Sequence, residues 1–145
     1  MNPIVRNILA VVAGIVVFNV LNMGIIIVGG KLMPPPAGVD PTNMESIKAY
    51  MHLFEPKHFV VPFLAHALAT LIGAFAAAKI AATRKMLFAM VIGVLGLLGG
   101  IAACFMIPAP TWFMALDLIA AYIPMAWIGG KLGGGSAPAA AIEAE

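Results

Sequence analysis

Residues 62–82, PFLAHALATLIGAFAAAKIAA, form an apolar run with a single histidine, His66, set among alanines. A helix needs roughly 20 such residues to cross a bilayer, so this run is long enough to span one. Small residues recur at every fourth position in two rows, which a helix would place side by side on one face. The rows are Ala65, Ala69, Gly73, Ala77 and Ala81, and His66, Thr70, Ala74, Ala78 and Ala82. Because such a face admits neighbouring helices closely, we expect this stretch to be the central helix of a bundle.

The composition of the whole chain predicts a membrane protein. Hydrophobic residues make up 63% of the 145 positions, charged residues only 10%, and the mean hydropathy is +1.06. These values are too apolar for a soluble domain of this size. Four segments are long enough to span a bilayer: 4–28, 59–82, 86–107 and 111–128. The predicted fold class is therefore all-α, a four-transmembrane-helix bundle over residues 1–132 that is surrounded by lipid.

Basic residues predict how the bundle is oriented. Four spans bring both termini to one side, and the cytoplasmic side carries more Lys and Arg in its short loops. One side would hold Arg6, Lys79, Arg84, Lys85 and Lys131, and the other Lys31, Lys48 and Lys57. We expect the first, larger set and both termini to be cytoplasmic, in a bacterial inner membrane. Residues 133–145 are of low complexity and are expected to form a cytoplasmic tail.

The loop between the first two spans is predicted to contain a helix of its own. Residues 42–45, TNME, match a capping box, and Pro56 would end the helix that they begin. The apolar residues of this segment share one side of that helix: Met44, Ile47, Met51 and Phe54. We expect a short amphipathic helix over residues 42–55, either at the outer interface or folded over the mouth of the bundle.

The third span carries the smallest residues at alternating spacings of four and three, which is the pattern of a close-packed helix seam. These positions are Ala89, Gly93, Gly96, Gly100 and Ala103. We therefore assign its glycines to helix packing and not to phosphate binding. Across the second and third spans, the residues predicted to pack helices are Ala65, Ala69, Gly73, Ala77, Gly93, Gly96 and Gly100.

Proline and aromatic residues mark the fourth span. Pro124 should kink it or free the carbonyl group of Ala120, one turn earlier. Trp112 and Phe113 at one end, and Trp127 at the other, are typical of aromatic anchors at the two membrane interfaces.

Polar residues inside the spans are predicted to lie at one level. Counting about 1.5 Å per residue from the outer ends of their spans places His66 and Asp117 about 9 to 11 Å deep. Asp117 is the only carboxylate in any span, and an ionised aspartate there costs about 2.5 to 3.5 kcal/mol, so it should pair with His66. Two asparagines of the first span reach the same level, and Thr70 and Tyr122 lie about a turn further in. The predicted layer comprises His66, Asp117, Asn19, Asn22, Thr70 and Tyr122.

No metal or cofactor is expected. His52 and His58 flank Pro56, which interrupts the helix that a zinc-binding histidine pair requires. Cys104 is the single cysteine, which excludes an internal disulfide, and we interpret it as a small apolar filler. A weaker alternative groups these three residues with the outer methionines as soft ligands for copper, although their spacing is irregular.

The sequence allows two interpretations of the polar layer. It is either a clasp that fixes how the spans pack, or the floor of an outward-facing pocket with the loop helix as its lid. Because small-residue faces exceed what four helices need, we favour a non-enzymatic accessory or structural subunit that packs beside other membrane proteins or its own copies. The alternative is a transporter or channel for a small solute or for protons that uses His66 and Asp117. No nucleophile and base share a level, so we expect no enzyme, and basic residues without interleaved aromatics argue against nucleic acid.

Overall fold

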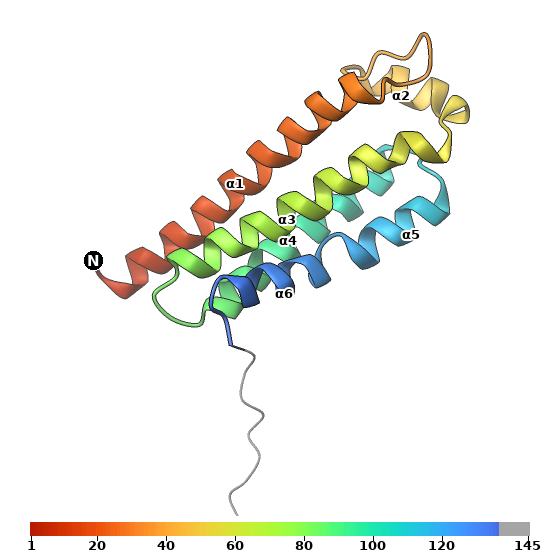
Figure 1. Cartoon of the computed structure of the whole chain (residues 1–145). Coiled ribbons are helices and arrows are strands. Elements are labelled where there is room, and N and C mark those ends of the chain that lie inside the picture. The colour runs from red at the N-terminus through yellow and green to blue at the C-terminus, as the bar shows by residue number, and fades with distance from the viewer. Residues whose placement is uncertain (137–145) are drawn as a thin grey trace, which may run out of the picture.

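The structure, a computed structural model, describes residues 1–136 and confirms the four-span helical bundle (Figure 1). The first span is α1 (Pro3–Leu32), the second α3 (Val60–Ile80) and the third α4 (Lys85–Met106). The fourth consists of α5 (Thr111–Ala120) and α6 (Ile123–Leu132). The end of the bundle with the N-terminus and the end of α6 is called the terminal end here, and the opposite end the loop end. The predicted tail from residue 137 onward lies outside the described residues.

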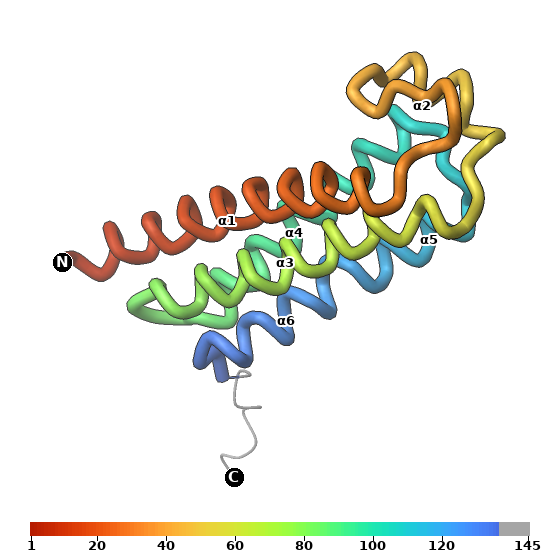
Figure 2. Tube along the Cα trace, turned by 45° about the horizontal axis from the view of Figure 1, so that its top comes forward, coloured from red at the N-terminus to blue at the C-terminus, as the bar shows by residue number. Residues whose placement is uncertain are grey.

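Helix α3 is the centre of the bundle, as its small-residue rows predicted. It packs against α1, α4 and α6, and both views place α1 and α6 on opposite sides of it (Figures 1 and 2). A core of buried alanines with Ile92 joins α3, α4 and α6. All seven residues predicted to pack helices are buried within this one chain: Ala65, Ala69, Gly73, Ala77, Gly93, Gly96 and Gly100.

Two glycine contacts bring helix backbones together directly. A Cβ atom added at Gly73 of α3 would lie 2.8 Å from the carbonyl oxygen of Gly14 in α1. One added at Gly129 of α6 would overlap the carbonyl oxygen of Leu71 and lie 3.0 Å from the backbone nitrogen of Phe75, both in α3. Such approaches require a residue without a side chain at the point of contact.

The fourth span is interrupted at the position that Pro124 predicted. The last backbone hydrogen bond of α5 runs from the Ala121 N–H to the Asp117 carbonyl at 2.9 Å. Helical hydrogen bonding resumes with the bond from the Ala126 N–H to the Tyr122 carbonyl at 2.8 Å. Pro124 has no N–H to donate to Ala120, so the helix cannot continue unbroken.

The loop helix is shorter than predicted, and its cap is one residue later. It consists of α2 (Met44–Tyr50) and the 3-10 turn η1 (Met51–Leu53) in place of residues 42–55. Asn43 is the N-cap and accepts from the Glu45 N–H at 2.9 Å. Thr42 instead donates its N–H and hydroxyl to the Asp40 carboxylate, at 2.9 and 2.6 Å. These two bonds also lower the pKa of the Asp40 carboxyl.

Pro56 begins a turn as well as ending the loop helix. The turn η2 (Pro56–Phe59) leads directly into α3. Glu55 and His58 form its capping box, in which the Glu55 N–H donates to His58 Nδ1 at 2.9 Å. Lys57 lies 2.9 Å from the Glu55 carboxylate and lowers its pKa.

At the terminal end, α1 is tied to the turn between α3 and α4. The Asn7 side chain accepts from the Ala82 N–H at 2.9 Å and donates to the Thr83 hydroxyl at 2.9 Å. The adjacent Arg6 donates to the Ile80 carbonyl at 2.6 Å. These contacts link residues more than 70 positions apart in the sequence.

Replacing Asn7 by Ala is expected to lower the free energy of unfolding by about 1 kcal/mol, because the turn loses three hydrogen bonds that water only partly replaces. Thermal unfolding in detergent micelles, followed by circular dichroism, measures the change. Asn19→Ala is the matched control, since the Asn19 amide donates only to Ile15 of its own helix. Equal effects of the two substitutions would contradict the assignment of Asn7 to the turn.

Candidate functional site

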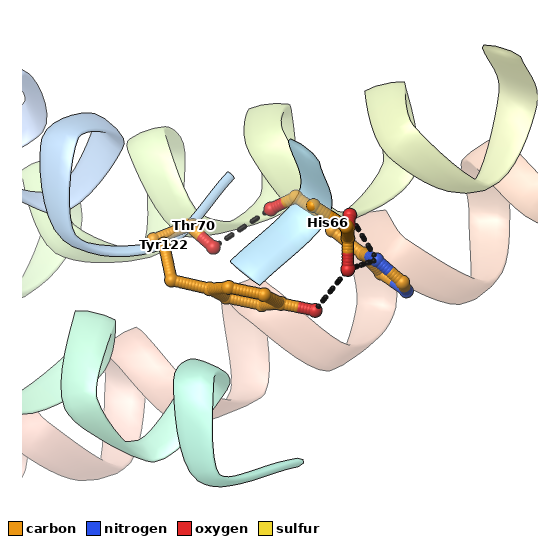
Figure 3. A network of polar contacts seen from close by, with 4 residues as sticks. His66, Thr70 and Tyr122 are labelled. Atoms are coloured by element: carbon orange, nitrogen blue, oxygen red, sulfur yellow. Dashed lines mark hydrogen bonds and ion pairs between the residues drawn. The ribbon is translucent and has the colours of Figure 1, made fainter. Parts of the chain in front are cut away.

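Asp117 and His66 form the predicted pair in the interior of the bundle. Both carboxylate oxygens of Asp117 lie 2.9 Å from His66 Nδ1. The Asp117 side chain is 7% exposed and that of His66 22%. Tyr122 donates its hydroxyl to the same carboxylate at 3.0 Å, and its ring stacks on the imidazole at 5.7 Å between centroids (Figure 3). One buried carboxylate therefore holds two partners, from α3 and from the break in the fourth span.

The break in the fourth span brings Tyr122 to Asp117. Positions five apart lie about 140° apart around a regular helix, so their side chains would point away from each other. The interruption before Pro124 reorients Tyr122, and the glycines of α4 make room for its ring. A Cβ at Gly100 would lie 2.6 Å from the Tyr122 hydroxyl oxygen, and one at Gly96 would lie 2.9 Å from the ring. The predicted glycine seam thus accommodates a specific tyrosine.

The other residues of the predicted layer do not join this network. Thr70 is buried, but its hydroxyl donates to the backbone carbonyl of His66 at 2.7 Å, within α3. Asn19 is exposed and donates to Ile15 of its own helix at 2.9 Å. Asn22 is half-buried, and its Oδ1 atom has no hydrogen-bond partner within residues 1–136. Neither amide forms a hydrogen bond with Asp117, although the Asn22 Oδ1 atom is itself buried.

A cavity of about 310 Å³ lies above the pair at the loop end, and it is called the chamber here. Its base includes His66, Asp117 and Gly100. The segment around α2 contributes four apolar residues to its lining: Pro41, Ile47, Met51 and Phe54. The remaining lining residues come from α1, η2, α3, α4, α5 and the link between α4 and α5: Ile26, His58, Phe59, Pro62, Ala103, Cys104, Ile107, Ala109, Phe113 and Met114.

An aromatic cluster beside the chamber was not identified in the sequence. Phe59 lies 4.7 Å from Phe113, 5.6 Å from Trp112 and 6.0 Å from Phe54 between ring centroids. Phe113 is buried and lines the chamber, so its prediction as an interfacial anchor is wrong. The only sequence signal was the apolar side of the loop helix, which includes Phe54.

The residues considered for a metal do not assemble into one site. His58 and Cys104 both line the chamber, whereas His52 is not among its lining residues. His58 Nδ1 already accepts the Glu55 N–H. Among residues 1–136, no three His, Cys, Asp or Glu side chains are placed to hold an ion.

The Asp117 contacts determine which atom His66 can offer to a ligand. An ionised carboxylate can only accept hydrogen bonds, so opposite the Asp117 carboxylate the His66 Nδ1 atom carries a hydrogen and donates it. The second ring nitrogen, Nε2, is then left for the chamber. It accepts a hydrogen bond when the imidazole is neutral and donates one when the ring is protonated.

Comparison of this chain with protein-family models, curated proteins and solved structures finds no match.

Proposed function

We propose that this chain is a non-enzymatic membrane protein that binds a small, mostly apolar molecule with one hydrogen-bonding group in the chamber. The observation that carries the proposal is an apolar cavity of about 310 Å³ whose base is a carboxylate-oriented imidazole. Ligand sites combine apolar walls with a few placed polar groups in this way. An engineered apolar cavity of about 150 Å³ holds benzene, so this volume suits a molecule of about two fused rings.

The chamber separates this proposal from a purely structural clasp. A clasp is complete when its buried groups are paired, and close-packed side chains above it would stabilise it best. Here the groups are paired and space remains above them. The His66 side chain is more exposed than that of Asp117, which supports a role in contact with a ligand.

The packing of the bundle removes the main argument for an accessory subunit. That interpretation depended on small-residue faces left over for a partner, and all seven predicted packing residues are buried within the chain. Gly24 and Gly30 of α1 and Gly99 of α4 are the glycines of these helices that have open space around them and remain available to a partner. A second protein in the purified particle would favour the subunit interpretation over ours.

Transport across the bilayer receives less support than binding at one side. A path for a solute or for protons would have to continue past Tyr122 toward the terminal end. The core there consists of tightly packed alanines and Ile92. We propose that the terminal end, with its larger set of basic residues, is cytoplasmic and that the chamber lies on the outer side. The bacterial inner membrane stays a prediction.

The experiment uses 1-naphthol and naphthalene, which differ only in one hydroxyl group. We expect 1-naphthol to shift the His66 Nε2 signal saturably in nuclear magnetic resonance spectra of ¹⁵N-histidine-labelled protein in micelles. The hydroxyl can bond to Nε2, whereas naphthalene can only fill the space. His52, outside the chamber lining, should show no change with either compound.

Two phenylalanine substitutions on α4 provide the matched control. Ala103 lines the chamber, so Ala103→Phe should fill it and abolish the shift without altering the His66–Asp117 pair. Its neighbour Ala102 is exposed on the outside of the bundle, and Ala102→Phe should leave the shift intact. The proposal fails if 1-naphthol does not move the His66 signal at saturation, or if both variants respond alike.

A further inference from the structure

The terminal end of the bundle carries a concentrated positive charge. It holds five basic residues: Arg6, Lys79, Arg84, Lys85 and Lys131. The acidic residues within 1–136 are Asp40, Glu45 and Glu55 in the loop and Asp117 in the bundle interior. All ion pairs within residues 1–136 therefore lie in the loop or beside the chamber, and none involves the basic residues of the terminal end. The terminal end therefore matches a negatively charged surface or ligand.

A groove of about 840 Å³ lies at this end, between the start of α4 and α6, and we call it the terminal groove. Thr83, Arg84, Lys85 and Ser136 are its polar lining residues. Its apolar lining residues include Leu87, Met90 and Trp127, and the side chains of Leu87 and Trp127 are 50% and 45% exposed.

The order of these residues along α4 gives the groove a charged end and an apolar end. Leu87 and Met90 follow Lys85 by two and five positions, which places them about 3 and 7.5 Å further along the helix axis. That direction leads from the end of the bundle toward the bilayer centre. Trp127 forms part of the wall on α6, and its ring lies 4.3 Å from the Lys131 ammonium group. A phospholipid has the same order of charged headgroup and apolar chain.

The start of α4 adds to the attraction for an anion. Helix N-termini carry a partial positive charge and are usually compensated by acidic or capping side chains. This 22-residue helix has no side-chain cap and no acidic residue in its first turn, and it begins at Lys85. Arg84 precedes it with a φ of 44°, a left-handed conformation that disfavours residues other than glycine. Two cations and a helix start that no side chain caps are thus gathered at one point.

We propose that the terminal groove binds an anionic phospholipid, with its phosphate against Arg84, Lys85 and the first turn of α4. One acyl chain lies along Leu87, Met90 and Trp127. Charge complementarity selects this occupant over a neutral lipid, and the adjoining apolar wall selects it over a free phosphate. This site is independent of the chamber and of the function proposed for it.

Native mass spectrometry of the full chain tests the proposal. The protein is equilibrated with phosphatidylglycerol and phosphatidylcholine of identical acyl chains, and the ratio of bound lipids is measured. We expect a preference for phosphatidylglycerol that falls about fivefold with Arg84→Gly and about fivefold with Lys85→Gln, the usual effect of one basic residue near a lipid surface. Lys31→Gln, at the loop end, should leave the preference unchanged.

The glycine variant separates lipid binding from folding. Glycine adopts the left-handed conformation of position 84 without strain, so Arg84→Gly should unfold at the same temperature or a higher one while losing lipid preference. Inorganic phosphate should not reproduce the thermal stabilisation that phosphatidylglycerol gives. Equal stabilisation by inorganic phosphate, or an equal loss of preference in Lys31→Gln, would overturn the proposal.

Discussion

Gly129→Ala is expected to destabilise the bundle by about 3 kcal/mol, the upper part of the usual range for overpacking a core. The new methyl group would overlap the Leu71 carbonyl oxygen and lie 3.0 Å from the Phe75 nitrogen. Both are backbone atoms in the middle of α3, so no side-chain rotation can relieve the contact. Helix α6 would have to move away from α3, and the alanine core between them would open.

The matched control is Gly99→Ala in α4. Nothing lies within 4 Å of a Cβ placed at Gly99, so the substitution adds the same methyl group without a clash. Alanine also favours a helix over glycine, and we expect stability to be unchanged or slightly raised. Thermal unfolding in detergent micelles distinguishes the two variants. Similar losses would mean that α3 and α6 are not in backbone contact.

Asp117→Ala is expected to cost about 3 kcal/mol, because it leaves the His66 Nδ1–H and the Tyr122 hydroxyl in the bundle interior without their acceptor. Asp117→Asn should cost less, since its amide oxygen still accepts one of the two hydrogen bonds. The same thermal measurement compares them. Glu45→Gln is the surface control: the Glu45 carboxylate lies on the surface, 3.3 Å from the ammonium group of exposed Lys48, and its replacement should change little.

Asp117→Asn has a second expected effect that a purely structural pair would not show. When the asparagine amide turns its N–H toward His66, Nδ1 becomes an acceptor and the ring hydrogen moves to Nε2. The chamber then presents a donor in place of an acceptor, so binding of 1-naphthol should weaken. The ¹⁵N signals of His66 report which ring nitrogen carries the hydrogen. Wild-type binding in a variant with exchanged tautomers would contradict our assignment of Nε2 to the ligand.

Much of this fold follows from lengths and spacings along the chain. Four apolar runs determine the number of spans, and the small-residue rows of residues 65–82 identify the central helix. The pairing of His66 with Asp117 also follows from the sequence, because topology and helix rise fix the depth of each residue. The depth of a residue depends only on its own helix, and it is obtained by counting residues from the end of that helix.

The sequence does not show how each helix is rotated about its own axis, and the remaining predictions depended on that rotation. Asn19 and Asn22 have the right depth, but Asn19 is exposed and neither forms a hydrogen bond with Asp117, because nothing local fixes how α1 turns toward its neighbours. Tyr122 was placed a turn away from Asp117, and only the break before Pro124 brings them together. The chamber follows no motif either, since its shape depends on how Phe59, Phe113 and the loop residues leave space between α1, α3, α4 and α5.

The unequal burial of the spans bears on how the protein is synthesised. Only 6% of the most apolar window of α1 is buried within the bundle, against 39% for the fourth span. Of these four spans, α1 is synthesised before the others, and it can rest in lipid with few buried contacts to them. The last one carries Asp117 and a broken backbone, and by then His66 is already in the membrane to receive it. Because of this order of the spans, the Asp117 carboxylate enters the membrane after its partner His66 and does not have to lie unpaired in hydrocarbon.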